Sequence, residues 1–167
     1  MNCLSFDVGG TTVKYGVIDE SYKILKKDKI PTPENENDFI YSLSNIIQEN
    51  LSIISKVSVA MPGYVNSANN KYLYGPHLKY DIDFSNLSNF ADYKFHLDND
   101  GNVAAYCEYF LNYKTKYSNL IMLTFGTGVG GGIISEGRLL RGRGNAGEIG
   151  HMLSLIHISE PTRPEDI

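Results

Sequence analysis

The first feature of this sequence that could do chemistry is a turn of glycine and threonine residues directly after a short apolar segment. The turn and its flanks contain Asp7, Gly9, Gly10, Thr11, Thr12 and Lys14. Glycine has no Cβ, so backbone N–H groups can approach phosphate oxygens, while hydroxyl groups add donors and a carboxylate can hold Mg²⁺ directly or through water. The pattern predicts a phosphate-binding turn. A plain hairpin turn is the alternative, because Gly-Gly-Thr is also frequent by chance.

A second glycine-rich turn is predicted at residues 127–132, again directly after an apolar segment. Residues 126–132 include five glycines, and each costs roughly 0.5–1 kcal/mol relative to alanine in a regular element. We therefore favour a turn whose function needs exposed backbone over a turn that only reverses the direction of the chain. The run lacks the Lys-Ser or Lys-Thr ending of a P-loop and the βαβ context of a dinucleotide fingerprint.

Asn99 and Asp100 form a third candidate, between a predicted strand and a predicted helix. A carboxylate at the C-terminal end of a strand can accept the proton of one hydroxyl group while the neighbouring amide binds the next hydroxyl. A polyol would suit such a pair. The alternative is helix capping, in which Asp100 or Asn102 binds the first N–H groups of the helix.

Glu148 and His151 form the fourth candidate, within a segment of small residues that leaves room for a ligand. The carboxylate offers an acceptor and the imidazole a switchable donor, and the i, i+3 spacing can place both on one face of a helical turn. By itself His151 would more often be a surface or core histidine. We assign that ordinary role to His77, His96 and His157.

Strands and helices predicted from apolar periodicity would position these groups. The predicted strands of the first half lie at residues 3–8, 12–19, 22–30 and 56–61. The first three form an antiparallel meander. An amphipathic helix, capped by Asn35 or Asn37, follows the third strand and continues to Ile54.

The second half continues the alternation of strands and helices. Residues 64–89 are rich in Asn, Tyr and Gly and predict long loops with a short helix at residues 86–90. The further predicted elements are a strand at 94–97, a helix at 102–113, a strand at 119–125 and a hairpin of 132–135 with 138–140. This order predicts an α/β domain over residues 1–117 and the beginning of a second, incomplete α/β domain over residues 118–152.

The composition limits the partners that we expect. The 167 residues are 42% hydrophobic and 20% charged, with a net charge of -4. This is typical of a soluble globular protein and offers no basic surface for nucleic acid or an anionic membrane. The sequence contains no secretory signal and no apolar run long enough to cross a membrane, and its two cysteines have no disulfide spacing. We expect a cytoplasmic protein.

The last fifteen residues, 153–167, continue neither a helical nor a strand periodicity. A sequencing-library adapter of the transposase-end type translates in frame to residues 153–163, and an index followed by more adapter accounts for the remainder. We therefore expect a non-native tail on a chain cut off after Met152, and we exclude the tail from arguments about the fold.

Taken in order, the four candidate segments resemble those of the ROK family of sugar kinases and sugar-sensing repressors, over residues 4–152. The resemblance includes the loop from Ala60 to Asn66, which is similar to the family's Pro-Gly-x-Val-Asp loop with Asn66 in place of the usual Asp. Gly101 likewise replaces a frequent alanine directly after Asp100. The resemblance implies an actin-like ATPase (RNase H-like) fold.

The resemblance also implies a role for each matching residue. The expected contacts to ATP phosphates and Mg²⁺ are Asp7, Gly9, Gly10, Thr11, Thr12, Lys14, Thr127 and Gly128. The expected contacts to the sugar are Gly63, Asn99, Asp100, Glu148 and His151. Asp100 would be the catalytic base that takes the proton of the attacking hydroxyl. Because phosphoryl transfer passes through a loose transition state, alignment matters more here than a strongly basic carboxylate.

The implied function is glucokinase-like: ATP-dependent phosphorylation of a hexose or a related sugar hydroxyl, with the intact protein a homodimer. The small-molecule partners would be the sugar and ATP, with no nucleic acid and no membrane. His151 would also bind a structural Zn²⁺ in the intact protein, although no cysteine follows Cys107 here to complete that site.

Three alternatives are open. A sugar-sensing ROK repressor without its DNA-binding domain would share the sugar site, but such repressors carry an N-terminal helix-turn-helix, and the phosphate motif here starts at the seventh residue. A non-catalytic assembly or chaperone-like ATPase of actin-like fold would keep the phosphate turns but not the sugar residues. The chain as written would also be an inactive fragment, because a half-built second domain exposes apolar strand surface.

Overall fold

The computed structural model describes residues 2–75, 77–88, 92–125, 128–142, 144 and 146–150. The chain divides into two compact units between Asp100 and Gly101. The domain boundary expected at residue 117 remains a prediction. The segment expected to be a foreign tail, 153–167, lies outside the described residues.

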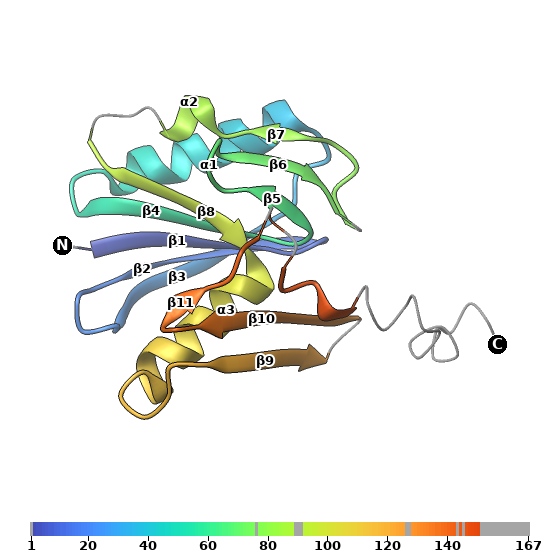
Figure 1. Cartoon of the computed structure of the whole chain (residues 1–167). Helices are drawn as coiled ribbons and strands as arrows, with labels where there is room; N and C mark the ends of the chain where they lie inside the picture. Colours follow the sequence, from blue (N-terminus) through green and yellow to red (C-terminus); the bar gives the residue numbers. More distant parts are fainter. Residues whose placement is uncertain are drawn as a thin grey trace. The chain divides into compact units, whose positions relative to one another are not determined.

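A five-stranded sheet in the order β3-β2-β1-β4-β8 forms the centre of the first unit (Figure 1). Its strands are β1 (Asn2–Val8), β2 (Thr12–Ile18), β3 (Ile24–Pro31), β4 (Ile54–Met61) and β8 (Lys94–Asn99). β1, β2 and β3 are antiparallel neighbours, which confirms the predicted meander. β1, β4 and β8 run parallel, so these strands end at the same edge of the sheet.

Helix α1 (Glu36–Asn50) connects β3 to β4 and packs on one face of this sheet (Figure 1). Asn35 caps it, as predicted, because its side-chain oxygen accepts a hydrogen bond of 3.0 Å from the N–H of Asp38. The predicted end at Ile54 is wrong. The helix stops at Asn50, and Ile54 is the first residue of β4. The side chain of Ile54 is apolar and buried, so it fits the apolar periodicity of a helix as well as that of a core-facing strand.

The main core of the first unit lies between α1 and the sheet. Leu4 and Phe6 of β1 are at most 2% exposed, and they belong to one apolar cluster with Phe39 and Leu43 of α1. Because side chains alternate along a strand, the residues between these core positions point to the opposite face. Ser5 is one of them, and it accepts a hydrogen bond of 2.8 Å from the hydroxyl of Ser58 on β4.

A small sheet occupies the region for which long loops were predicted, and that prediction is wrong. Its strands are β5 (Tyr64–Asn66), β6 (Lys71–Tyr74) and β7 (Ile82–Asp83), in the order β5-β6-β7. The short helix α2 (Ser85–Ser88) follows. These strands have two to four residues, too few to produce a recognisable alternation. The fully buried ring of Tyr72 anchors the sheet in the core.

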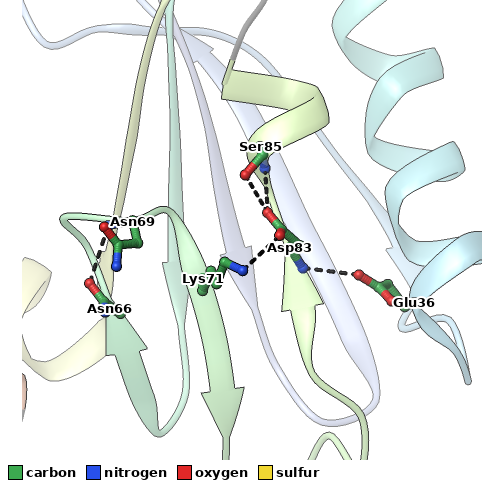
Figure 2. A network of polar contacts seen from close by, with 6 residues as sticks. All are labelled: Glu36, Asn66, Asn69, Lys71, Asp83 and Ser85. Carbon is green, nitrogen blue, oxygen red and sulfur yellow. Dashed lines mark hydrogen bonds and ion pairs between the residues drawn. The ribbon is translucent and has the colours of Figure 1, made fainter.

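A network of polar contacts ties this sheet to α1 (Figure 2). The carboxylate of Asp83 accepts hydrogen bonds from the N–H (2.9 Å) and hydroxyl of Ser85. It also pairs with the ammonium group of Lys71 at 2.9 Å. The backbone N–H of Asp83 donates to a carboxylate oxygen of Glu36, in the first turn of α1, at 3.0 Å. One aspartate thus links β6, β7, α2 and α1.

This network predicts a loss of stability in acid. The hydrogen bond from the Ser85 hydroxyl is the largest of the effects that lower the pKa of Asp83, from 3.8 to about 2. A depressed pKa stabilises the folded state above the unfolded pKa, and this stabilisation is lost as pH falls from about 4 to about 2. Asp83→Asn should therefore lower the free energy of unfolding at pH 7 by less than about 1 kcal/mol, because the pair is partly solvated.

Urea unfolding of Asp83→Asn and the unmodified chain at several pH values would measure this difference. The two curves should converge towards pH 2. Asp92→Asn, which changes another exposed carboxylate of the first unit, is the matched control. A difference that persists unchanged at pH 2 would contradict the assigned electrostatic origin.

The described part of the second unit contains most of helix α3 and a three-stranded sheet. Helix α3 (Asp100–Glu108) continues as a π-helical turn (Tyr109–Tyr113), and the strands are β9 (Leu120–Phe125), β10 (Val129–Ser135) and β11 (Arg138–Leu139). β10 and β11 form the predicted hairpin across Glu136 and Gly137. Within the described part of the chain, no helix is long and apolar enough to cross a membrane.

The predicted glycine turn at residues 127–132 is wrong for most of its length, because Gly130, Gly131 and Gly132 lie within β10. Packing gives the reason for the last of these glycines. A Cβ on Gly132 would be 2.5 Å from the Cβ of Ala105, so the bare backbone lets α3 approach the strand closely. At Gly132 the bare backbone therefore serves helix–strand packing.

Candidate functional site

The phosphate turn, residues 9–12, connects β1 to β2. β1 and β2 are paired up to Val8 and Val13, and the N–H of Gly9 donates a hydrogen bond of 3.0 Å to the carbonyl of Thr12. Gly10 and Thr11 at the tip are exposed. The turn therefore presents backbone and hydroxyl groups to solvent at the end of a buried strand, as a phosphate site requires.

Asp7 and Lys14 lie opposite each other on the two strands that flank this turn. Their carboxylate and ammonium groups are 3.8 Å apart, and the side chains are 64% and 70% exposed. An exposed ion pair contributes only about 0–1 kcal/mol. Either group can therefore leave its partner and bind a ligand. The carboxylate can bind a cation, and the ammonium group can bind a phosphate.

Thr32, the residue after β3, holds the phosphate turn from the side. Its hydroxyl donates a hydrogen bond of 2.7 Å to the carbonyl of Gly9, and its N–H donates one of 3.1 Å to the carbonyl of Thr11. Together with the bond to Thr12, these contacts occupy three carbonyl oxygens of the turn. Exposed carbonyl oxygens would repel an anion. Because these three carbonyl oxygens accept hydrogen bonds within the protein, the exposed tip of the turn is more favourable for phosphate.

A second turn, the acceptor turn at Pro62–Gly63, follows β4. Gly63 has φ of +93°, the left-handed region that favours glycine. A Cβ at Gly63 would be 2.6 Å from both the Cα of Gly75 and the carbonyl oxygen of Tyr74. The amide of Asn99 donates a hydrogen bond of 3.0 Å to the carbonyl of Gly63. The end of β8 is therefore fixed to the acceptor turn.

Asp100 follows Asn99 as the first residue of α3. Asn99 is 7% exposed, whereas Asp100 is exposed. The amide is thus fixed in the protein while the adjacent carboxylate reaches solvent. An exposed carboxylate beside a fixed amide can accept a proton from a bound hydroxyl group.

Parallel pairing brings these groups to one edge of the five-stranded sheet. β1, β4 and β8 are adjacent and parallel, and ligand sites in open α/β sheets lie at the carboxyl ends of such strands. The candidate residues gathered at this edge are Asp7, Gly9, Gly10, Thr11, Thr12, Lys14, Gly63, Asn99 and Asp100. Hydrogen-bond donors of the phosphate turn and acceptors such as the carboxylates therefore lie at the same edge of the sheet.

The other candidate residues are distributed differently. Gly128 is exposed directly before β10, and Glu148 is half-buried; both belong to the second unit. Glu148 follows Gly147, where a Cβ would be 3.0 Å from the side-chain oxygen of Asn102 in α3. Two candidates lie outside the described residues, Thr127 and His151.

Comparison with known proteins is decisive for the family. The sequence model of the ROK family matches residues 3–160. The chain belongs to the ROK family. This confirms the resemblance inferred from the four candidate segments.

Named relatives of this ROK chain are sugar kinases. It is 32% identical over 157 residues to a glucokinase of Streptomyces coelicolor, a match that covers 89% of the chain and 49% of the relative. It is 31% identical over 159 residues to a β-glucoside kinase of Listeria monocytogenes, covering 92% of the chain and 54% of the relative. The ROK chain thus spans about half the length of these curated relatives.

A solved ROK structure supports the fold. The glucokinase of Streptomyces griseus, in complex with glucose and AMPPNP, superposes with a TM-score of 0.76 at 28% identity, covering 90% of this chain and 50% of that one. The predicted α/β, actin-like ATPase fold is confirmed by such neighbours. The structure and the family therefore agree on the architecture of this ROK chain.

Thr32 is part of the site but was not predicted from the sequence. The only local signal is a hydroxyl residue directly before Pro33, and nothing in that pair indicates a contact with a turn more than 20 residues earlier. The contact arises because β2 and β3 form a hairpin, which returns the end of β3 to the beginning of β2.

Thr32→Val should loosen the phosphate turn, because valine has a similar shape but leaves the Gly9 carbonyl without its hydroxyl donor. The expected loss in the free energy of unfolding is about 1 kcal/mol, measured by urea denaturation of the chain. The matched control is Thr115→Val, at an exposed threonine of the second unit. If the two variants lost equal stability, the Thr32 hydroxyl would contribute nothing specific to the stability of the phosphate turn.

Proposed function

We propose that this chain supplies the phosphate turn and part of the sugar site of an enzyme that transfers the γ-phosphoryl group of ATP to a hydroxyl of a hexose or a related sugar. The observation that carries the proposal is the arrangement at one sheet edge, where the phosphate turn adjoins the acceptor turn, Asn99 and Asp100. A glucokinase and a β-glucoside kinase are among its named relatives.

In the proposed reaction the candidate residues divide between ATP and the sugar. The phosphate turn and Lys14 hold the phosphates of ATP, with Thr127 and Gly128 as a second contact. Gly63 and Asn99 orient the sugar. Further sugar contacts in the proposed site are Asp100, Glu148 and His151. Asp100 accepts the hydroxyl proton as the new bond to phosphorus forms and the bond to ADP breaks.

Mg²⁺ would neutralise charge on the phosphates when bound. The donor set fits this ion, because Mg²⁺ is held by one or two carboxylates together with substrate phosphates and waters. Asp7 offers one exposed carboxylate beside the phosphate turn. Within the described residues, no group of three or more His, Cys, Asp or Glu side chains could share a metal ion.

Other properties of the longer protein are also proposals. A structural Zn²⁺ on His151 would need ligands beyond those that this chain offers. The homodimer is proposed from the family, and the cytoplasmic location from the composition and cysteine content of the sequence. The chain as written would be inactive, because one face of β9 is exposed: Ile121 by 68%, Leu123 by 44% and Phe125 by 76%. Exposed apolar strand surface of this kind normally needs a cover.

The test is a coupled assay of ADP release with the protein expressed from its full reading frame, recovered past Met152. A panel of glucose, N-acetylmannosamine and a β-glucoside should include at least one sugar that stimulates ADP release well above the sugar-free rate. The 167-residue chain should give no stimulation under the same conditions. Tight sugar binding by the full protein without ADP release would instead favour the sugar-sensing regulator.

A further inference from the structure

One loop contacts both turns of the proposed site. This bridging loop, residues 75–81, connects β6 to β7, and all of it but residue 76 is described. At its beginning, Gly75 packs against the acceptor turn, since a Cβ on Gly63 would be only 2.6 Å from the Cα of Gly75. The bridging loop therefore begins in backbone contact with the turn that is proposed to bind the sugar.

His77 is the residue through which the bridging loop reaches the phosphate turn. A Cβ placed on Gly10 would be 2.9 Å from the Cβ and Cγ of His77 and 3.2 Å from its Nδ1. The imidazole thus packs on the bare backbone of Gly10. Both residues are exposed, so the ring borders the solvent-facing tip of the turn, where a phosphate would bind.

The bridging loop is also anchored after His77. Leu78, the next residue, is 4% exposed, and its carbonyl accepts a hydrogen bond of 3.4 Å from the Tyr72 hydroxyl. The hydroxyl of Tyr80 donates a hydrogen bond of 2.6 Å to the carbonyl of Pro33, the neighbour of Thr32. A backbone fixed in this way reduces the entropy that His77 loses on binding a ligand.

We propose that His77 is a further phosphate-contacting residue, which donates a ring N–H to an oxygen of the ATP phosphate bound beside Gly10. This inference rests on the proposed function. Imidazole has at least one N–H in each neutral tautomer, and a hydrogen bond from it to a charged phosphate oxygen is stronger than one between neutral groups. His77 gains and loses no proton in the reaction, because the hydroxyl proton goes to Asp100.

The test compares three variants of the protein expressed from its full reading frame, with ATP and an accepted sugar. His77→Leu keeps the packing but removes the N–H, and His77→Gln restores an N–H donor. His96→Leu makes the same change at an exposed histidine of β8. We expect His77→Leu to raise the KM for ATP about tenfold, with a smaller change in the KM for the sugar.

His77→Gln should recover most of the affinity for ATP, and His96→Leu should behave like the unmodified protein. Thermal unfolding of each variant shows whether it is folded. An unchanged KM for ATP in His77→Leu, or a His77→Gln variant as impaired as His77→Leu, would overturn the role of His77 while the proposed function stands. Absence of sugar-dependent turnover in the unmodified protein would overturn both.

Discussion

Asp100→Asn should lower kcat by about a hundredfold to ten-thousandfold, the range over which a positioned general base contributes. The amide keeps the shape of the side chain but cannot accept the proton of the sugar hydroxyl. Since the proton moves only in the transition state, the KM for the sugar should change much less than kcat. Steady-state kinetics of the protein expressed from its full reading frame would measure both constants.

The control for this variant is Asp28→Asn. Asp28 lies on β3, its side chain is exposed, and its carboxylate accepts a hydrogen bond from the N–H of Lys29 that an asparagine can also accept. Its kcat should equal that of the unmodified protein. Full activity of Asp100→Asn would refute the assignment of the base.

Gly63→Ala should have the largest effect on stability. The φ of +93° is unfavourable for alanine, and the new Cβ would be 2.6 Å from backbone atoms of Tyr74 and Gly75, which cannot rotate away. Strain in the left-handed region and overpacking each cost about 1–3 kcal/mol. We therefore expect the free energy of unfolding to fall by about 2–4 kcal/mol, measured by denaturant unfolding of the chain.

The same variant should also weaken sugar binding, because the Gly63 carbonyl holds the amide of Asn99. Gly128→Ala is the matched control for stability. It adds the same methyl group at an exposed position where no atom lies within 4 Å of the new Cβ. Equal stability of the two variants would show that the acceptor turn tolerates a side chain, contrary to the observed packing.

The sequence predicted those parts of the fold in which apolar periodicity extends over several residues. The meander of β1, β2 and β3 and the cap at Asn35 are examples. The small sheet of β5, β6 and β7 was missed, because strands this short leave no periodicity in the sequence. Their pairing depends on burial of Tyr72 and Ile82 in a core that residues distant in the sequence complete.

The candidate site was only partly predictable for a related reason. Motifs in single segments identified the phosphate turn and the Asn99–Asp100 pair, since each is local in the sequence. Thr32 and His77 have no local motif, and they reach the phosphate turn only through the β2–β3 hairpin and the bridging loop. The glycines of β10 were predicted to form a turn but lie in a strand. The sequence did not distinguish the two, because close packing requires the same bare backbone as a phosphate turn.

The most direct test of the central claim is to follow the transfer itself by phosphorus NMR. The protein expressed from its full reading frame is mixed with ATP, Mg²⁺ and the sugar that stimulates ADP release. A sugar-phosphate signal should grow as the γ-phosphate signal of ATP declines, and Asp100→Asn should slow this growth by about a hundredfold or more. Release of inorganic phosphate without a sugar phosphate, or no consumption of ATP, would contradict the central claim.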